Sequence, residues 1–512
     1  MGLLIAAAIA RRNVLPHGGL YPDEAWQAFG AAKGSLSNLL TVGFSAPGFT
    51  GVLMVWHRLV GAPEQMAYLP FVAGLLTPAV SYVVLRRIGT AWSVSVLLGA
   101  ALASERLNVI YSGRVKSYVI DALIVLGFAV VLPRLVRVRF SWRAAALWVV
   151  GSSAVGFFSP FARIASAVAG MIRWVRASGD RAVRAAAVVG QGVLLAVVTA
   201  AVRRTYDVKA LETWWKRNYD GFIRLDGQPL RDVVHIETHM RRVAGVFSGG
   251  PIWWASLTLS VVMVTLGVDA IVRRGSSRAV RAQYLLVLML VAVVANMVGA
   301  LPFGPTSIGM RLSLWLVPVF VIGGASALNR LRAALARQGV ARIAFDATAV
   351  VVALVLIVGA SVGGPPKHSS DMTSAASFLE STLTTNDVVF INRTSGAFSY
   401  AVTSHADVHV RPRHSLVAFE PDFRDPRFHY FVLGGKRRNK VILPTESSGD
   451  ASNVARVIGR ADRVYIYVQV VPNAQRRGRF AFAIVLHTLG YRQESDTRFK
   501  FARVVVWRRS VS

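Results

Sequence analysis

The sequence predicts a polytopic α-helical membrane protein with about eleven transmembrane helices, followed by a soluble α/β domain. Of the 512 residues, 54% are hydrophobic and only 16% are charged, whereas soluble domains carry about 25% charged residues. Apolar runs long enough to cross a bilayer recur as far as residue 362. The chain has 58 Lys and Arg but 26 Asp and Glu, a net charge of +32. These basic residues gather in short arginine clusters between the apolar runs, a pattern typical of membrane topology.

The same composition excludes several other classes of protein. Intrinsic disorder is excluded because the chain has ample apolar surface to bury. A nucleic-acid-binding domain gathers its basic residues on one soluble face, and the arginine clusters of this chain do not, so nucleic acid is not an expected partner. The chain has no cysteine, which excludes disulfides and thiolate sites.

Eight apolar runs are individually long enough, or nearly so, to cross a bilayer. They cover residues 66–85, 92–110, 118–133, 182–202, 251–272, 282–301, 312–328 and 346–362. Residues 144–172 would form one helix roughly 43 Å long, which is too long for one crossing. The sequence Phe157-Phe158-Ser159-Pro160 interrupts this stretch, and because proline ends or kinks a helix, we expect two short helices here.

Five short loops between the runs carry the basic clusters, with Asp180 almost the only acid among them. The clusters are Arg86 and Arg87; Arg134, Arg137, Arg139 and Arg143; Arg173, Arg176, Arg181 and Arg184; Arg273, Arg274, Arg278 and Arg281; and Arg330, Arg332, Arg337 and Arg342. The positive-inside rule places all five loops in the cytoplasm, and this requires residues 144–172 to cross twice. With a short first span, the prediction is a multi-pass cell-membrane protein of eleven crossings, with a cytoplasmic N-terminus and an extracytoplasmic C-terminus.

The predicted domains follow from this topology. Residues 1–362 form a transmembrane domain with extracytoplasmic loops at 13–63 and 203–250, and residues 363–512 form an extracytoplasmic α/β domain. The first span, residues 1–10, is only about half a crossing long. A stub helix, a truncated or misassigned start and the remains of a signal peptide are all open, and the signal peptide is the weakest because no basic region precedes the apolar one.

The tail alternates strand-like and helical patterns, which predicts a small layered α/β domain. Strands are expected at 387–391, 430–433, 463–470 and 500–507, and helices at 373–383, 395–404, 451–460 and 480–489. In the first loop, amphipathic segments are expected at 24–40 and 51–60.

The acid pair Asp23-Glu24 lies at the outer end of the first span. Carboxylates beside an apolar interior are costly and commonly functional. Partial burial raises the proton affinity of a carboxylate while nearby cations keep it ionised, a combination that suits a general base. The alternative is structural, since Pro22 can begin a helix whose dipole first-turn acids complement. Spacing alone favours the structural alternative.

A second candidate site lies in the sequence from Tyr111 to Asp121. Arg114 and Lys116 could bind a phosphate at the outer interface, and Tyr118 could donate a hydrogen bond to it. Asp121 falls inside the next apolar run. The alternative, equally open, is that these basic and aromatic side chains anchor the ends of the spans at the interface. Arg311 could likewise either bind a phosphate or anchor the end of a span at the interface.

The second outer loop combines aromatic and basic residues. In residues 207–224, Trp214 and Trp215 alternate with cations on what would be an interfacial amphipathic helix. Headgroup binding and simple membrane contact are both open. His235 and His239 would share one helical face, but Glu237 does not stand where the HExxH zinc signature requires it. A polar helix is therefore favoured, although a divalent cation is left open as a cofactor.

Several of these motifs, in this order, resemble one family. They are Tyr21-Pro-Asp-Glu-Ala25, Ser45-Ala-Pro-Gly-Phe-Thr-Gly-Val-Leu53, Leu69-Pro-Phe-Val-Ala-Gly-Leu-Leu76, Tyr111-Ser-Gly-Arg-Val-Lys-Ser-Tyr118, Leu211-Glu-Thr-Trp-Trp215, Leu301-Pro-Phe-Gly304, Arg311-Leu-Ser-Leu-Trp-Leu-Val-Pro318, Phe378-Leu-Glu380 and Asn386-Asp-Val-Val-Phe390. The sequence resembles GT-C-fold glycosyltransferases that use a polyprenyl-phosphate sugar, such as the protein O-mannosyltransferases and aminoarabinose transferases. Each motif is short, and the ordered set is more specific than any member.

The resemblance implies a membrane glycosyltransferase acting on an extracytoplasmic hydroxyl. It implies that Asp23 activates the acceptor, with Glu24 assisting. Lys116 and Arg311, together with Arg203 or Arg204, would face the donor phosphate, and direct displacement would invert the anomeric centre. The expected partners are the lipid-linked donor, the bilayer and an unidentified glycan, lipid or protein acceptor.

Two other classes compete with this interpretation. A transporter or lipid flippase usually carries polar groups near the bilayer midplane, often on broken helices in related halves. The charged groups of this chain gather instead at the outer ends of the spans, and its second half does not repeat the first. The remaining alternative is a non-catalytic envelope scaffold that uses its α/β tail to bind partners.

Overall fold

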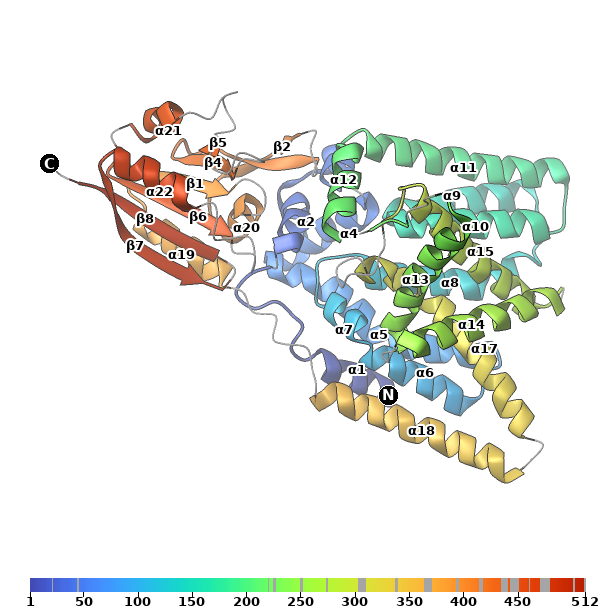
Figure 1. The fold of residues 1–512 in the computed structure, drawn as a ribbon. Helices are drawn as coiled ribbons and strands as arrows, with labels where there is room; N and C mark the ends of the chain where they lie inside the picture. The colour runs from blue at the N-terminus through green and yellow to red at the C-terminus, as the bar shows by residue number, and fades with distance from the viewer. Residues whose placement is uncertain are drawn as a thin grey trace. The chain divides into compact units, whose positions relative to one another are not determined.

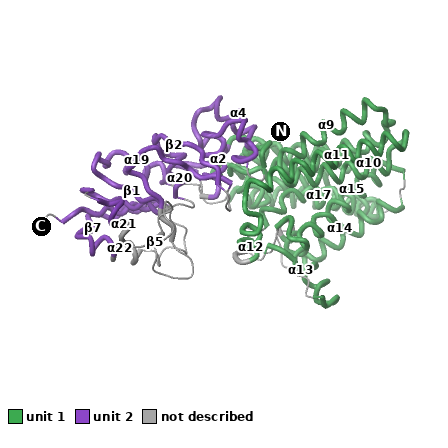
Figure 2. The backbone as a smooth tube through the Cα atoms, turned by 90° about the horizontal axis from the view of Figure 1, so that it is seen from above, with its two compact units in different colours: residues 1–15, 44–49, 68–366 green, residues 16–43, 50–67, 367–512 purple. Residues whose placement is uncertain are grey.

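The computed structural model comprises residues 1–512, and its described part divides into two compact units (Figure 2). The residues outside the described part are 21, 44–45, 220, 224–226, 249–251, 273–274, 303–309, 337–338, 363–370, 393–395, 414–417, 434–440, 443–450, 460, 470–478, 501 and 511–512. Unit 1 contains residues 1–15, 44–49 and 68–366, and unit 2 contains residues 16–43, 50–67 and 367–512. The contacts thus group most of the first predicted loop, residues 13–63, with the C-terminal tail. The predicted division at residue 362 stays a prediction.

Unit 1 is helical (Figure 1). Its elements are α1 (Gly2–Arg11), α5 (Tyr68–Arg87), α6 (Trp92–Ser104), α7 (Arg106–Ser112), α8 (Tyr118–Leu135), α9 (Trp142–Phe158), α10 (Pro160–Arg176), α11 (Arg181–Arg203), α12 (Val208–Tyr219), α13 (Pro229–Ser248), α14 (Ile252–Val272), α15 (Ser277–Met297), η3 (Arg311–Leu316), α17 (Val317–Leu335) and α18 (Gly339–Val362). Side-chain caps begin several of these helices: the oxygens of Ser141, Asp180 and Ser276 each accept a backbone N–H in the first turn.

The helices of unit 1 confirm a polytopic membrane protein. Within the described residues, seven segments are long and apolar enough to cross a bilayer. They are Pro63–Arg87, Tyr118–Leu135, Arg181–Arg203, Trp253–Val272, Ser277–Met297, Arg311–Leu335 and Gly339–Val362. Helices α1 and α9 are apolar but shorter. The predicted total of eleven crossings and the positions of the termini stay predictions, and Arg273, Arg274 and Arg337 of the basic clusters lie outside the described residues.

Two predicted segments show how polar residues break apolar helices. Residues 144–172 form two helices, as expected, because Ser159 caps α10 and Pro160 begins it. The Ser166 hydroxyl donates to the Ser152 carbonyl at 2.6 Å, so α10 folds back along α9.

The span expected at 92–110 is instead a pair of helices bent by 58°. Glu105 causes this break, because its carboxylate accepts the N–H groups of Leu107 and Asn108 and starts a new helix.

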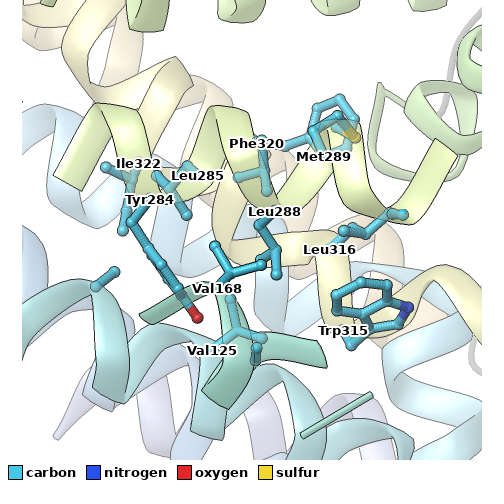
Figure 3. Close-up of a cluster of buried hydrophobic side chains, with 14 of the residues drawn as sticks. Val125, Val168, Tyr284, Leu285, Leu288, Met289, Trp315, Leu316, Phe320 and Ile322 are labelled. Carbon is cyan, nitrogen blue, oxygen red and sulfur yellow. The ribbon is translucent and has the colours of Figure 1, made fainter. Parts of the chain in front are cut away.

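The core of unit 1 lies where α8, α10, α14, α15 and α17 meet. Figure 3 shows Tyr284 beside Leu285, Leu288 and Ile322, with its hydroxyl on the side of Val125. The Tyr284 hydroxyl is fully buried and has no hydrogen-bond partner among the described residues. Such a group carries an uncompensated desolvation cost of about 1–3 kcal/mol.

Replacing this tyrosine by phenylalanine should therefore leave the protein as stable or more stable. We expect Tyr284→Phe to keep or raise the Tm of the purified protein in detergent, since it removes the hydroxyl while keeping the ring. The matched variant Tyr465→Phe should lower the Tm, because the Tyr465 hydroxyl donates to the Thr382 carbonyl at 3.0 Å. A clear drop in Tm for Tyr284→Phe would contradict this account of the core.

Unit 2 combines first-loop helices with a six-stranded sheet. The first loop supplies α2 (Pro22–Lys33), η1 (Leu36–Asn38), α3 (Leu39–Val42) and most of α4 (Pro47–Val60), and η2 (Pro63–Ala67) follows it. The tail supplies α19 (Met372–Thr382), β1 (Val388–Asn392), α20 (Gly396–Thr403), β2 (Val408–Pro412), β3 (Phe419–Phe423), β4 (Phe428–Leu433), β5 (Val441–Ile442), α21 (Ala451–Ile458), β6 (Arg463–Gln469), α22 (Arg479–Thr488), β7 (Tyr491–Phe499) and β8 (Ala502–Arg509).

The sheet of the tail has helices on both faces. Its strand order is β5-β4-β1-β6-β8-β7, with β1 parallel to both β4 and β6 and the other pairs antiparallel. Successive side chains of a strand point to opposite faces, so Val389 and Ile391 pack with α19 and α20 while Phe390 packs with α21 and α22. Strands β2 and β3 form a separate antiparallel pair. The predicted α/β layers are confirmed.

The orientation of this tail can be tested by labelling a single cysteine, because the chain has no native one. Ser374 is exposed on α19. We expect Ser374→Cys to react with a membrane-impermeant maleimide on intact cells. Arg143→Cys, in an exposed position at the start of α9, should react only after permeabilisation. The reverse pattern would contradict the predicted topology.

Candidate functional site

The connection between α7 and α8 carries the predicted phosphate-binding residues. Helix α7 ends at Ser112, and Gly113 caps it. A Cβ at Gly113 would lie 2.1 Å from the carbonyl oxygen of Val14, so only glycine allows this close approach. The backbone N–H of Lys116 donates to the Arg114 carbonyl at 2.7 Å. The side chain of Lys116 is buried and that of Arg114 is partly buried. The connection is thus packed within unit 1. This packing restricts the side chains of Arg114 and Lys116 more than an exposed loop would.

A row of aromatic rings joins this connection to Arg311. The Arg311 guanidinium lies 5.9 Å from the centre of the Tyr111 ring, within the range of a cation–π contact. Tyr111 meets Tyr118 edge-on at 5.5 Å, and Tyr118 meets Phe161 at 6.2 Å. Phe161 stacks on Trp315 at 5.5 Å. The structure therefore brings Arg311 and Tyr118, which are almost two hundred residues apart, to one place, and Arg114 and Lys116 lie on the chain between the two tyrosines.

Asp121 is fully buried below this connection. Its carboxylate accepts hydrogen bonds from the Ser117 hydroxyl, at 2.8 Å, and from the Ser159 hydroxyl. The same Ser159 oxygen accepts the Ala162 N–H at 3.0 Å and so caps α10. These contacts join the start of α8 to the break between α9 and α10. They give Asp121 a structural role, and its predicted role toward substrate stays a prediction.

The basic residues at the end of α11 lie on the surface of unit 1. Arg203 and Arg204 are both exposed, and the next buried side chain is that of Tyr206. Burial raises the pKa of Tyr206, while the positive charges of Arg203 and Arg163 act in the opposite direction. Exposed guanidinium groups can reach an anionic headgroup, but they can also simply anchor the span.

The tryptophans of the second loop contribute to the core. Trp215 is buried in the main hydrophobic cluster, and Trp214 packs against that cluster with its ring 5.1 Å from Trp215. Their helix, α12, has the helical conformation expected for the loop, although Arg224 lies outside the described residues. Since one face of this helix is committed to packing, Trp214 is the more accessible of the two to a ligand.

Asn296, which is not among the predicted site residues, positions this loop. Its amide group donates to the carbonyls of Gly221 and Leu301 at 2.8 and 2.9 Å, and its oxygen accepts the Ile223 N–H at 2.7 Å. Asn296 is fully buried near the end of α15. A polar residue among apolar neighbours was the available signal, because such a group needs hydrogen-bond partners.

The described residues do not form a recognisable metal site. No three of the described His, Cys, Asp and Glu residues lie close enough to hold a metal ion. His235 and His239 share α13 as expected, but the His239 ring contacts the carbonyl of His235 at 3.2 Å. Glu237 lies 3.6 Å from Arg241. The described residues do not fit the divalent cation left open by the sequence.

The acid pair lies in unit 2, in the first turn of α2. Glu24 is fully buried and Asp23 is partly buried. Pro22 begins the helix, as the structural alternative expects. Because Glu24 is buried, Asp23 is the more accessible of the two acids to a substrate.

Contacts with the tail hold α2 in place within unit 2. The Phe29 ring lies 5.8 Å from Phe398 of α20 and 6.2 Å from Phe419 of β3. The Gln27 amide donates to the Thr50 hydroxyl at 2.5 Å. This packing of α2 on the tail is not among the predictions from the sequence, where the available signal was the apolar face of α2. The tail thus positions the helix that carries the two acids, and the predicted meeting of these acids with the cations of unit 1 stays a prediction.

Two solved structures of ArnT from Cupriavidus metallidurans are similar to this chain. The apo structure aligns with a TM-score of 0.54 at 12% sequence identity, covering 98% of this chain and 96% of that one. The structure bound to undecaprenyl phosphate gives a TM-score of 0.50 with the same identity and coverage. An Archaeoglobus fulgidus oligosaccharyltransferase, in complex with zinc and sulfate, gives 0.47 at 13% identity, covering 91% of this chain and 68% of that one.

These likenesses are structural, since no family model matches the chain and no curated protein matches its sequence. The alignment with apo ArnT extends over nearly the whole of both chains. It therefore includes the helical unit and the α/β tail together. The chain has the GT-C fold of ArnT, as the order of its sequence motifs predicted.

Proposed function

We propose that this chain is a membrane glycosyltransferase that transfers a sugar from a polyprenyl phosphate to an extracytoplasmic hydroxyl group. The observation that carries the proposal is the position of Arg311 against Tyr111, with Tyr118 beside it and Lys116 on the connection between the two tyrosines. Guanidinium and ammonium groups gathered among aromatic side chains suit a phosphate attached to a hydrocarbon chain. The GT-C fold supports this assignment, because ArnT with that fold binds undecaprenyl phosphate.

The donor would place its prenyl chain in the bilayer and its phosphate beside these cations. Arg311 and Lys116 stabilise the charge that develops on the leaving phosphate oxygen, with Arg203 or Arg204 contributing from the surface of the unit. In this proposal Arg114, Tyr118 and Asp121 would line or support the same region, and Trp214 and Trp215 would border it at the second loop. A donor lying at the membrane boundary would require them at one end of the helices.

The acceptor would be activated by the first-loop acids. Asp23 removes the proton from the acceptor hydroxyl as its oxygen attacks the anomeric carbon, while the bond from that carbon to the phosphate oxygen breaks. The proton stays on Asp23 and the electron pair leaves with the polyprenyl phosphate. Glu24, buried beside Asp23 on α2, assists by positioning. A single displacement of this kind inverts the anomeric configuration.

The proposal is tested by following the donor. The purified full chain, reconstituted in lipid nanodiscs, is supplied with a panel of labelled polyprenyl-phosphate pentoses and hexoses and an extract of envelope glycans, lipids and proteins. We expect release of free polyprenyl phosphate from at least one donor, together with labelled product of inverted configuration. A transporter or a scaffold would leave every donor intact, and that result would contradict the proposal.

A further inference from the structure

A second cationic site lies in unit 1, among helix ends that the proposed transfer does not use. A cavity of about 520 Å³ opens between α5, α14, α15 and α17. Its polar lining is dominated by five arginines, namely Arg86, Arg278, Arg281, Arg330 and Arg332. The lining contains a single acid, Asp269. These arginines belong to basic clusters that the positive-inside rule predicts to be cytoplasmic, and they lie near the ends of α5, α15 and α17.

Internal ion pairs compensate only part of this charge. Arg330 forms an ion pair with Asp269 at 2.6 Å. Arg332 binds both carboxylate oxygens of Asp346 at 2.8 Å. Arg86 donates to the Thr90 carbonyl at 2.5 Å, which supplies no negative charge.

Arg278 and Arg281 are the remaining cations of the cavity. Among the described residues, neither of them forms a hydrogen bond or an ion pair. Arg281 is nevertheless only 9% exposed. The negative charge of Asp269 acts on Arg281, but that carboxylate is already paired with Arg330. The charge of Arg281 is therefore only partly compensated, and a bound anion would compensate the rest.

The position of these two arginines on their helix also favours a bound anion. Arg278 and Arg281 lie in the first turns of α15 (Ser277–Met297). The helix dipole places partial positive charge there, which disfavours cations and favours anions. The side chains of Arg278 and Arg281, which form no hydrogen bond or ion pair with a described residue, both line the cavity.

The rest of the lining indicates the kind of anion. Leu266, Ala282 and Ile322 provide apolar walls beside the arginines. Basic pockets between membrane helices on the cytoplasmic side suit phosphate-bearing lipid headgroups. We propose that this cavity is a phosphate-binding site, formed around Arg278 and Arg281, that takes the phosphate of an anionic lipid headgroup or of a soluble phosphate ester.

The site is tested by ligand binding to the purified full chain in detergent. The probes are short-chain phosphatidylglycerol, phosphatidylcholine with the same acyl chains, and inorganic phosphate. We expect phosphatidylglycerol to bind at least about tenfold more tightly than phosphatidylcholine. The double variant Arg278→Gln with Arg281→Gln should weaken its binding by about 10–100-fold, the range for losing charged hydrogen bonds. Arg143→Gln, an exposed arginine outside the cavity, should bind as wild type does.

The measurement with inorganic phosphate distinguishes a lipid headgroup from a soluble phosphate ester as the source of the anion. Inorganic phosphate that displaces the lipid and binds as tightly would support a soluble ester, whereas weaker binding would support a lipid headgroup. Phosphatidylglycerol that binds like phosphatidylcholine, or binds the double variant as it binds wild type, would overturn the site.

The Tm of the lipid-free protein separates a binding role from a structural one. Because Arg281 has no described acceptor, we expect Arg281→Gln to leave the Tm unchanged or to raise it in the absence of an anion. It should reduce only the rise in Tm caused by phosphatidylglycerol. A fall in the Tm of the lipid-free variant would mean that Arg281 stabilises the fold itself, and would overturn the proposal.

Discussion

Asp23→Asn is expected to lower the rate of sugar transfer by about 10²–10⁴-fold, the contribution that a positioned general base makes. The amide has nearly the shape of the carboxylate but cannot accept the acceptor's proton. Since Asp23 is only partly buried in the first turn of α2, the substitution should leave the fold intact. Donor binding, measured by displacement of a labelled polyprenyl phosphate, should be close to that of wild type.

A matched variant separates this effect from a general loss of acidic charge. Glu64 lies in η2 of the same unit, and its carboxylate accepts a long hydrogen bond, 3.4 Å, from the Thr373 hydroxyl. We expect Glu64→Gln to transfer sugar at nearly the wild-type rate. If Asp23→Asn transfers as fast as Glu64→Gln does, Asp23 is not the base.

Arg311→Gln should lower the kcat/KM for the donor much more than it changes the KM for the acceptor. Charged hydrogen bonds to phosphate contribute about 1.5–3 kcal/mol each, and stabilising the leaving phosphate adds to this in the transition state. We therefore expect the donor's kcat/KM to fall by about 10²–10³-fold, while the KM for the acceptor changes little. Steady-state kinetics with each substrate varied in turn measures the split.

Two further variants define what Arg311 supplies. Arg311→Lys keeps the charge but loses the planar fork of donors, so it should recover only part of the activity. Arg106→Gln removes an exposed cation from α7, the helix that carries Tyr111, and should leave the donor's kcat/KM unchanged. Equal losses in Arg106→Gln and Arg311→Gln would indicate a general electrostatic effect and not a phosphate contact.

Much of this fold is predictable from patterns within short segments. The break at Ser159-Pro160 was predicted because a helix cap and a helix-starting proline stand side by side in the sequence. The strands β1, β4, β6 and β8 were predicted because their apolar residues are continuous or alternate. The strand Tyr491–Phe499 was missed because it pairs only with β8, at the edge of the sheet, and is largely polar. The bend at Glu105 was missed because a single capping carboxylate interrupts an otherwise apolar run.

The candidate site was predictable in composition but not in its contacts. The sequence indicated Arg311 and Tyr118 as chemically suitable, yet their meeting through the Tyr111 ring depends on how η3 packs beside α7 and α8. The docking of Phe29 on Phe398 and Phe419 likewise joins segments more than 360 residues apart in the sequence. Neither contact follows from local periodicity, because both arise from tertiary packing. A resemblance in motif order could name the residues but not their neighbours.

Cross-linking of two introduced cysteines tests most directly whether the base and the donor-binding cations form a single site. The chain has no native cysteine, so Asp23→Cys with Arg311→Cys gives a defined pair, and Asp23→Cys with Arg143→Cys gives a matched one on the opposite predicted side of the membrane. With a short bismaleimide, we predict an intramolecular cross-link in the first pair and none in the second. Absence of a cross-link in the first pair, although both thiols react with a monofunctional maleimide, would contradict the proposed active site.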